Sequence, residues 1–342
     1  MKQVKRKFAY LFVVILILSL LAGCGNQEAD EEGQPEPQKT IKAGMVTDVG
    51  GLGDQSFNDA AHRGLKKAED ELGAEINVIE SNLPSDYVPN LSSMAEQGFD
   101  MVWAIGVLMT DAVIEAADQY PDTKFGIIDA VVEKPNVASI TFKEEDGSYL
   151  MGIISGEMTE KNKVGFVGGM EIPLIKKFEA GFRAGFKEVN PDGEVLVGYT
   201  GAFDDPGAGK ELATTQFDQG ADIIYHASGA CGVGVINAAK ELGEDYYAIG
   251  VDSPQAHLAP DSVITSMVKA VDFAVYDTIE KMANNNFEAK HYVLGLEEDA
   301  VIPSEHLEEM APESVIEKVN EYKEKIISGE IKVPESPEEL NQ

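Results

Sequence analysis

The chain has few cysteines and few positive charges relative to its negative ones. Its 342 residues include two cysteines, Cys24 and Cys231, so a metal site built on several cysteines is excluded. At most one disulfide could form. Lysine and arginine number 27 against 60 aspartates and glutamates, which gives a formal net charge of -33. Because so acidic a chain repels phosphate backbones and anionic lipid head groups, we expect no nucleic-acid partner.

Several chemical signatures are missing as well. The five histidines show no metal-ligand spacing, and no serine or cysteine lies in a nucleophile-elbow pattern. The stretch GAGKE suggests a phosphate loop, but Asp204 and Glu211 stand where that motif needs glycine and serine or threonine. GLGDQS and GACGVG miss the third glycine of the dinucleotide fingerprint. We therefore predict no catalytic residue, no metal site and no cofactor, although an acid–base pair of carboxylates stays open.

The N-terminus has the pattern of an export signal. A basic segment, MKQVKRK, precedes an apolar run that is too short and wrongly flanked for a membrane span. The run ends in Leu21-Ala22-Gly23-Cys24, which resembles the lipobox of a bacterial lipoprotein precursor. The resemblance implies cleavage after residues 1–23 and a diacylglyceryl group on the Cys24 thiol. An ordinary secretory signal or an uncleaved anchor is the alternative.

The segment after this signal has the composition of a linker. Residues 24–40 are rich in Glu, Gln and Pro and lack apolar periodicity, so we predict a flexible tether. With Cys24 lipidated, Cys231 has no intrachain disulfide partner and is expected to be a small packed residue.

From residue 41 onward, apolar runs of strand length alternate with amphipathic stretches of helix length. This is the rhythm of parallel sheets covered by helices on both faces. The predicted strands are 41–46, 76–80, 101–106, 124–129, 137–142, 163–169, 194–201, 222–228, 246–252, 263–268 and 291–296. The predicted helices are 57–72, 88–97, 110–119, 173–189, 208–219, 233–242, 271–285 and 312–329.

The first ten strands fall into two sets of similar length and order, which predicts two doubly wound lobes joined by a hinge, without a residue-level repeat. The N-terminal lobe is expected to comprise 41–142 with part of about 270–295. The C-terminal lobe is expected to comprise 143–268 with part of about 296–330, and 331–342 forms an acidic tail.

Ligands of open parallel sheets sit outside the carboxyl ends of the strands. The residues that follow the predicted strands repeatedly include single carboxylates and single phenylalanines. Rings can stack on a flat ligand, and carboxylates accept hydrogen bonds from hydroxyl or N–H groups. This rim therefore favours a flat, neutral, hydroxyl-rich ligand. The candidates are Asp48, Phe57, Asn58, Asp129, Phe178, Phe203, Gly229, Asp252 and Lys269.

Five stretches together resemble the basic membrane lipoprotein family, the substrate-binding lipoproteins of nucleoside ABC transporters of the purine nucleoside receptor type. They are GMVTDVGGLGDQSFNDAAHRGL, NKVGFVGGMEIPLIKKFEAGFRAGF, GYTGAFDDPGAGKELA, GADIIYHASGACGVGVINAAKE and IGVDSPQ. The resemblance spans about 41 to about 328. It implies a type I periplasmic-binding-protein fold that closes around a ligand between two lobes. The strongly acidic composition departs from the family's name.

The resemblance also implies roles for the candidate residues. Phe57 and Phe203 would sandwich a nucleobase, and Asp48 and Asn58 would hydrogen-bond its edge. Asp129, Asp252 and Lys269 would address the ribose and its polar surroundings, and Gly229 would allow close backbone approach. Phe178 either closes the ribose side or is an ordinary core residue. Lys269 has a second interpretation, the neutralisation of Asp252 or Asp129.

The expected function is a lipid-anchored receptor on the outer face of the bacterial cell membrane that delivers nucleosides, with purines as the family expectation. The partners would be an ABC permease and its ATPase, the membrane would be reached through the lipid on Cys24, and the protein would be a monomer. A sugar or polyol binder, a ligand-sensing surface lipoprotein and a nucleoside hydrolase are the alternatives.

Overall fold

The computed structural model describes residues 40–341, and these form two α/β lobes, each built on a six-stranded sheet. The predicted signal peptide, Cys24 and residues 24–39 of the predicted tether lie outside the described residues. The α/β class with two doubly wound lobes is confirmed. None of the helices in the described part combines the length and apolar composition that a membrane crossing requires.

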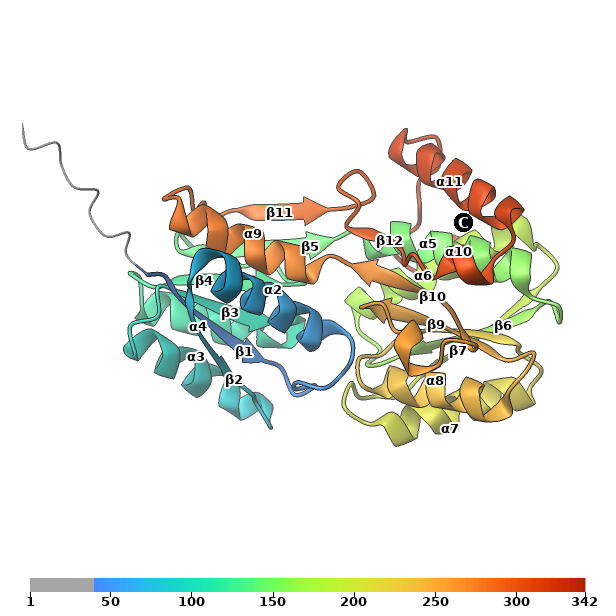
Figure 1. Cartoon of the computed structure of the whole chain (residues 1–342), viewed down its shortest axis with the longest axis horizontal. Coiled ribbons are helices and arrows are strands. Elements are labelled where there is room, and N and C mark those ends of the chain that lie inside the picture. Colours follow the sequence, from blue (N-terminus) through green and yellow to red (C-terminus); the bar gives the residue numbers. More distant parts are fainter. Residues whose placement is uncertain (1–39, 342) are drawn as a thin grey trace, which may run out of the picture. The chain divides into compact units, whose positions relative to one another are not determined.

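The first sheet has the strand order β11-β5-β4-β3-β1-β2, and its pairs are parallel. Its strands are β1 (Lys42–Thr47), β2 (Glu75–Ile79), β3 (Met101–Ile105), β4 (Lys124–Ile128), β5 (Val137–Phe142) and β11 (His291–Leu294). The helices of this lobe are α2 (Phe57–Leu72), α3 (Tyr87–Glu96), α4 (Thr110–Gln119) and α9 (Val271–Ala283), and α9 lies beside α2 (Figure 1).

The second sheet repeats this plan with the order β12-β10-β9-β8-β6-β7. Its strands are β6 (Lys163–Gly168), β7 (Glu194–Tyr199), β8 (Ile223–Ala227), β9 (Tyr247–Asp252), β10 (Val263–Lys269) and β12 (Val301–Pro303). Its helices are α5 (Glu144–Met158), α6 (Pro173–Val189), α7 (Pro206–Asp218), α8 (Cys231–Leu242), α10 (Leu307–Met310) and α11 (Glu313–Ile327). In each sheet the strand order reverses beside the first strand of the lobe, β1 or β6, and ligands of doubly wound sheets bind at such a reversal.

The chain crosses between the lobes three times, and the directions of the crossings explain one exception to parallel pairing. It passes from β5 to α5, returns from β10 to α9, and passes again from β11 to β12. β11 pairs parallel to β5 because both run toward the second lobe. β12 pairs antiparallel to β10 because the two strands traverse the crossing in opposite directions (Figure 1).

Three elements were not predicted: α5, β12 and the helix α10, which is four residues long and too short for a periodic signal. α5 is buried around almost its whole circumference, from Glu144 to Ser155, so it shows no alternation of apolar and polar faces. β12 is three residues long, which is too short for a periodic signal. The predicted acidic tail, 331–342, contributes Ile331 and Val333 to packing against the core, and its Glu335 pairs with Lys177 of α6 at 3.0 Å.

Candidate functional site

A pocket between the two sheets lies at the carboxyl ends of the strands and encloses about 580 Å³, counting the part open to solvent. All nine candidates from the sequence line it: Asp48, Phe57, Asn58, Asp129, Phe178, Phe203, Gly229, Asp252 and Lys269. Further lining residues are Gly50, Asp54, Gly106, Val107, Leu108, Leu174, Ile175, Ala227, Ser228 and Val251.

The loop after β1 is held by its own carboxylates. Asp54 accepts hydrogen bonds from the backbone N–H groups of Ser56, Asn58 and Asp59 at 2.9, 2.8 and 3.1 Å, and so it caps the N-terminus of α2. Burial raises the pKa of Asp54 to about 6, although these N–H groups oppose the shift. Asp54, rather than Ser56, therefore supplies the side chain that caps α2. The Ser56 hydroxyl instead donates to Asp252 Oδ2 at 2.7 Å, which joins the two lobes.

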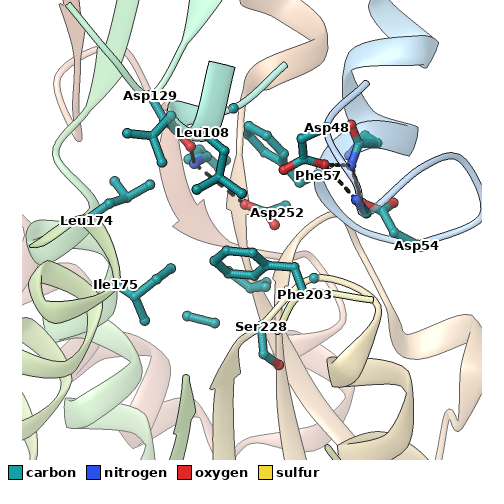
Figure 2. Close-up of a pocket in the computed structure, with 18 of the residues that line it drawn as sticks. Asp48, Asp54, Phe57, Leu108, Asp129, Leu174, Ile175, Phe203, Ser228 and Asp252 are labelled. Carbon is teal, nitrogen blue, oxygen red and sulfur yellow. Dashed lines mark hydrogen bonds and ion pairs between the residues drawn. The ribbon is translucent and has the colours of Figure 1, made fainter. Parts of the chain in front are cut away.

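The same loop fixes the orientation of Asn58. Its Nδ2 donates to Asp48 Oδ1 at 3.0 Å and to Asp54 Oδ2 at 3.3 Å (Figure 2). Because both partners are carboxylates, the amide nitrogen must face them, and Oδ1 remains as a buried acceptor without a partner among the described residues. Burial raises the pKa of Asp48, and the hydrogen bonds from Asn58 and Gly50 oppose that shift. This corner of the pocket therefore offers acceptors to a ligand.

The aromatic side chains stand on two sides of the pocket. Figure 2 shows the rings of Phe57 and Phe203 above and below Asp252, with Leu174 and Ile175 along one side. Both rings are half-buried. Phe178 is more deeply buried at 2 % exposure, and its ring centroid lies 5.6 Å from the Lys269 amine. Phe57 and Phe203 are therefore the rings placed to face a ligand.

Lys269 is the last residue of β10 and lies where the chain returns to the first lobe. Its amine is 2.6 Å from Asp129 Oδ2 and 3.8 Å from both Asp252 Oδ1 and Glu144 Oε1. Burial works to lower the pKa of Lys269, but these three carboxylates together raise it. Lys269 is thus a cation shared by Asp129 and Asp252, with the closer contact to Asp129, as in the second of the two interpretations from the sequence. Oδ1 of Asp129 is buried without a hydrogen-bond partner among the described residues.

Asp129 and Asp252 occupy equivalent places, each at the end of the fourth strand of its lobe. Both have left-handed backbones, with φ of 66° and 62°. Such a conformation is uncommon for a residue other than glycine and is often found at functional sites. The backbone turns both carboxylates to the same amine, although one comes from each lobe.

The structure requires glycine at position 229 for a different reason from the one expected from the sequence. Its φ is 56°, and a Cβ there would lie 2.9 Å from the Phe203 carbonyl oxygen. The N–H of the next residue, Ala230, donates to that same oxygen at 2.8 Å. The close backbone approach is therefore to the loop that carries Phe203, and it helps to position that ring.

The aliphatic wall of the pocket and Glu144 were not predicted from the sequence. Leu108 follows β3, and Leu174 and Ile175 lie in the first turn of α6 after β6. The rule that ligands sit beyond strand ends could have identified all three, but isolated aliphatic residues carry no chemical signal. The prediction for Cys231 agrees with the structure, in which this residue is buried and free. His226 is also buried and is hydrogen-bonded to Gln255 at 2.9 Å.

Comparison with known proteins decides the family. The sequence model of the Bmp family, described as "ABC transporter substrate-binding protein PnrA-like", matches residues 41–337. The chain belongs to the Bmp family. The resemblance inferred from the sequence is thereby confirmed, and the Bmp family is one of substrate-binding proteins of ABC transporters rather than of enzymes.

Individual relatives cover nearly the whole chain. A protein of Listeria innocua called "CD4+ T-cell-stimulating antigen" is 38% identical over 97% of this chain and 99% of its own length. "Basic membrane protein A" of Borreliella burgdorferi is 36% identical over 87% of this chain and 88% of its own length. The crystal structure of an ABC transporter solute-binding protein from Aeropyrum pernix K1 superimposes with a TM-score of 0.81, at 30% identity over 87% of this chain and 95% of that one.

Proposed function

We propose that this Bmp-family chain is a lipid-anchored receptor that captures nucleosides, with purines as the expectation from the family resemblance, and delivers them to an ABC permease and its ATPase. The observation that carries the proposal is the pairing of two phenylalanine rings with buried acceptors in one pocket. Stacking on aromatic side chains tolerates any nucleobase, because every base has a π-face. The ribose hydroxyls and the base N–H groups would supply donors.

The unpartnered acceptors support a ligand that carries hydrogen-bond donors. Oδ1 of Asn58 and Oδ1 of Asp129 are buried, and both residues line the pocket. A buried acceptor without a donor costs about 1–3 kcal/mol. A nucleoside that donates from its base to Asn58 and from its sugar to Asp129 removes both costs, which a purely apolar ligand cannot do.

The charge of the pocket favours a nucleoside over a nucleotide. Among the described residues that line it, Asp48, Asp54, Asp129 and Asp252 are acidic and Lys269 is the one cation. The Lys269 amine is already bonded to Asp129. A phosphate group would therefore meet carboxylates without a free counter-charge, and like charges brought together in a desolvated site cost several kcal/mol.

A calorimetric titration tests the ligand class. We expect saturable binding of one molecule of guanosine, adenosine or inosine, and we expect the corresponding 5′-monophosphates to bind about 100-fold more weakly or worse, from the cost of like charges. Free ribose and glucose are the controls for a sugar or polyol receptor, and cytidine and uridine test the preference for purines. Saturable binding of a sugar with none of any nucleoside would overturn the proposal, as would release of free ribose from a bound nucleoside.

The lipid anchor is tested separately, because Cys24 lies outside the described residues. The chain expressed in a bacterial host is expected to appear in the membrane fraction, and Cys24→Ala is expected to move it to the soluble or secreted fraction. Intact-mass measurement should show a diacylglyceryl-modified N-terminal cysteine in the first case. The anchor would be contradicted if Cys24→Ala stayed in the membrane fraction and the native chain carried no acyl group.

A further inference from the structure

Glu144 is a buried carboxylate that the proposed binding site does not use. It is the first residue of α5, directly after the first crossing between the lobes, and its side chain is 1 % exposed. It does not line the pocket, and its Oε1 has no hydrogen-bond partner among the described residues. The Glu144 Oε1 atom forms an ion pair with the Lys269 amine at 3.8 Å. Buried carboxylates are normally paired and hydrogen-bonded, so this one calls for an explanation.

The crossings of the chain bring Glu144 and Lys269 together. Glu144 follows β5 on the way into the second lobe, and Lys269 ends β10 on the way out. Lys269 therefore faces three carboxylates, since Asp129 and Asp252 also contact its amine. One amine balances one negative charge. If all three carboxylates were ionised, the buried cluster would carry excess negative charge in a place with little water.

The ionised forms of the other two carboxylates, Asp129 and Asp252, can be stabilised by hydrogen-bond donors. Asp252 receives a hydrogen bond from the Ser56 hydroxyl, and both Asp129 and Asp252 line the pocket, where ligand hydroxyls can donate to them. Glu144 has neither a hydroxyl partner nor a place at the pocket. It is therefore the member of the cluster that most needs a proton.

We propose that Glu144 is a positioning residue that holds a proton whenever the pocket is occupied, and that this proton leaves Lys269 free to hold Asp129 and Asp252. Once ionised, Glu144 competes for the amine and draws it from the two carboxylates that border the ligand. Ligand capture is thereby linked to a proton at the hinge. The inference rests on the proposed function only for the identity of the ligand.

The surroundings of Glu144 agree with this assignment. Burial raises the pKa of Glu144 to about 8, against the pull of Lys269 and with the help of Asp129 and Glu145. Glu145 is paired with Lys177 at 3.5 Å, and the hydroxyl of Tyr225, whose pKa burial raises, is hydrogen-bonded to Ser148. The charged and titratable groups facing the cluster are Lys269 of β10, Asp129 after β4, Asp252 of β9, Glu145 of α5, Lys177 of α6, Tyr225 of β8, Arg63 of α2 and Asp48 after β1.

The first test needs no ligand. The Glu144 carboxyl has a pKa of about 8 in the folded chain and of about 4.5 in the unfolded chain, so between these pH values only the folded chain keeps the proton. The free energy of unfolding therefore falls as the pH rises from about 4.5 to about 8. The buried acids Asp54 and Asp146, with pKa values near 6, complete their titration earlier. We therefore expect the unfolding free energy of the native chain to fall between about pH 6.5 and about pH 8, and this fall to be smaller in E144Q, where Asp48 and Asp252 remain as the buried carboxyls whose pKa values burial raises. E144L, which also removes the titratable carboxyl group, should show the same pH dependence of stability as E144Q.

The second test measures affinity for adenosine, which does not itself titrate near neutral pH. If the occupied site requires the proton, the dissociation constant should rise about tenfold from pH 7 to pH 9 for a group with pKa about 8. In E144Q it should stay level over this range. E157Q is the matched control, because it makes the same change at the far end of α5, where Glu157 is partly exposed and pairs with Lys318, and it should keep the dependence of the native chain.

The outcomes separate the two claims. An E144Q variant whose stability and affinity depend on pH as the native chain's do would overturn the role of Glu144. If no nucleoside binds but E144Q reduces the fall in stability, the proposed ligand is wrong and the proton on Glu144 stands. A native chain whose stability and affinity are both level from pH 6.5 to pH 9 would overturn the inference, since the two arms would then find no such proton.

Discussion

Lys269→Met is expected to abolish detectable nucleoside binding and to lower the free energy of unfolding by about 3–5 kcal/mol, the range for removing one partner of a buried ion pair. The Lys269 amine is 2.6 Å from Asp129, and both side chains are less than 5 % exposed. Methionine fills nearly the same space but leaves Asp129 and Asp252 without their counter-charge. Both carboxylates would then take up protons or turn away from the pocket. Calorimetry and chemical denaturation at neutral pH measure the two effects.

Lys210→Met is the matched control for this substitution. Lys210 pairs with Glu241 at 2.7 Å on the surface, where both side chains are well exposed. Exposed pairs contribute about 0–1 kcal/mol, so this variant should bind ligand normally and lose little stability. The double variant Asp129→Asn with Lys269→Met should recover part of the lost stability, because it removes one of the unpaired charges. A stable Lys269→Met protein that binds nucleosides as the native chain does would show that the buried cluster does not organise the site.

Topology explains why so much of the pocket could be predicted from the sequence. Asp48, Asp129 and Asp252 each stand at or just beyond the end of a strand whose apolar run is plain in the sequence. In parallel sheets these ends meet at one edge, so the side chains that follow them lie close together. Their proximity can therefore be predicted without knowing how the helices pack. The left-handed backbone of Asp129 and Asp252 lies beyond such reasoning, because no local pattern distinguishes these aspartates from others.

Contacts between distant segments could not be predicted in the same way. The bond from the Ser56 hydroxyl to Asp252 joins residues 196 positions apart, and it depends on how the lobes face each other. Glu144 was hidden for a related reason. It begins a helix buried on all sides, next to a second glutamate and an aspartate that make the segment look solvent-exposed. Its burial follows from the crossing of the chain between the lobes, which composition does not encode.

Phe57→Ala and Phe203→Ala are each expected to weaken nucleoside binding by about 10-fold to 100-fold, because stacking on an aromatic side chain contributes about 1–3 kcal/mol per base. Phe57 begins α2 and Phe203 lies in the loop after β7, so the two rings reach the pocket from different lobes. A base held between them would lose one stacked face in either variant. Isothermal titration with the tightest nucleoside measures both losses, and the double variant should show no saturable binding.

Two controls separate stacking from other effects of these substitutions. Phe57→Leu keeps apolar volume but removes the flat ring, so it should recover little affinity if the ring stacks and most of it if the residue only fills space. Phe273→Ala makes the same change on α9 at a side chain that is 53 % exposed and outside the pocket, and it should leave affinity unchanged. A Phe203→Ala variant with native affinity would show that the ring does not face the ligand. The ligand would then be held by its polar contacts alone, as in a sugar receptor, and free ribose should compete for the site.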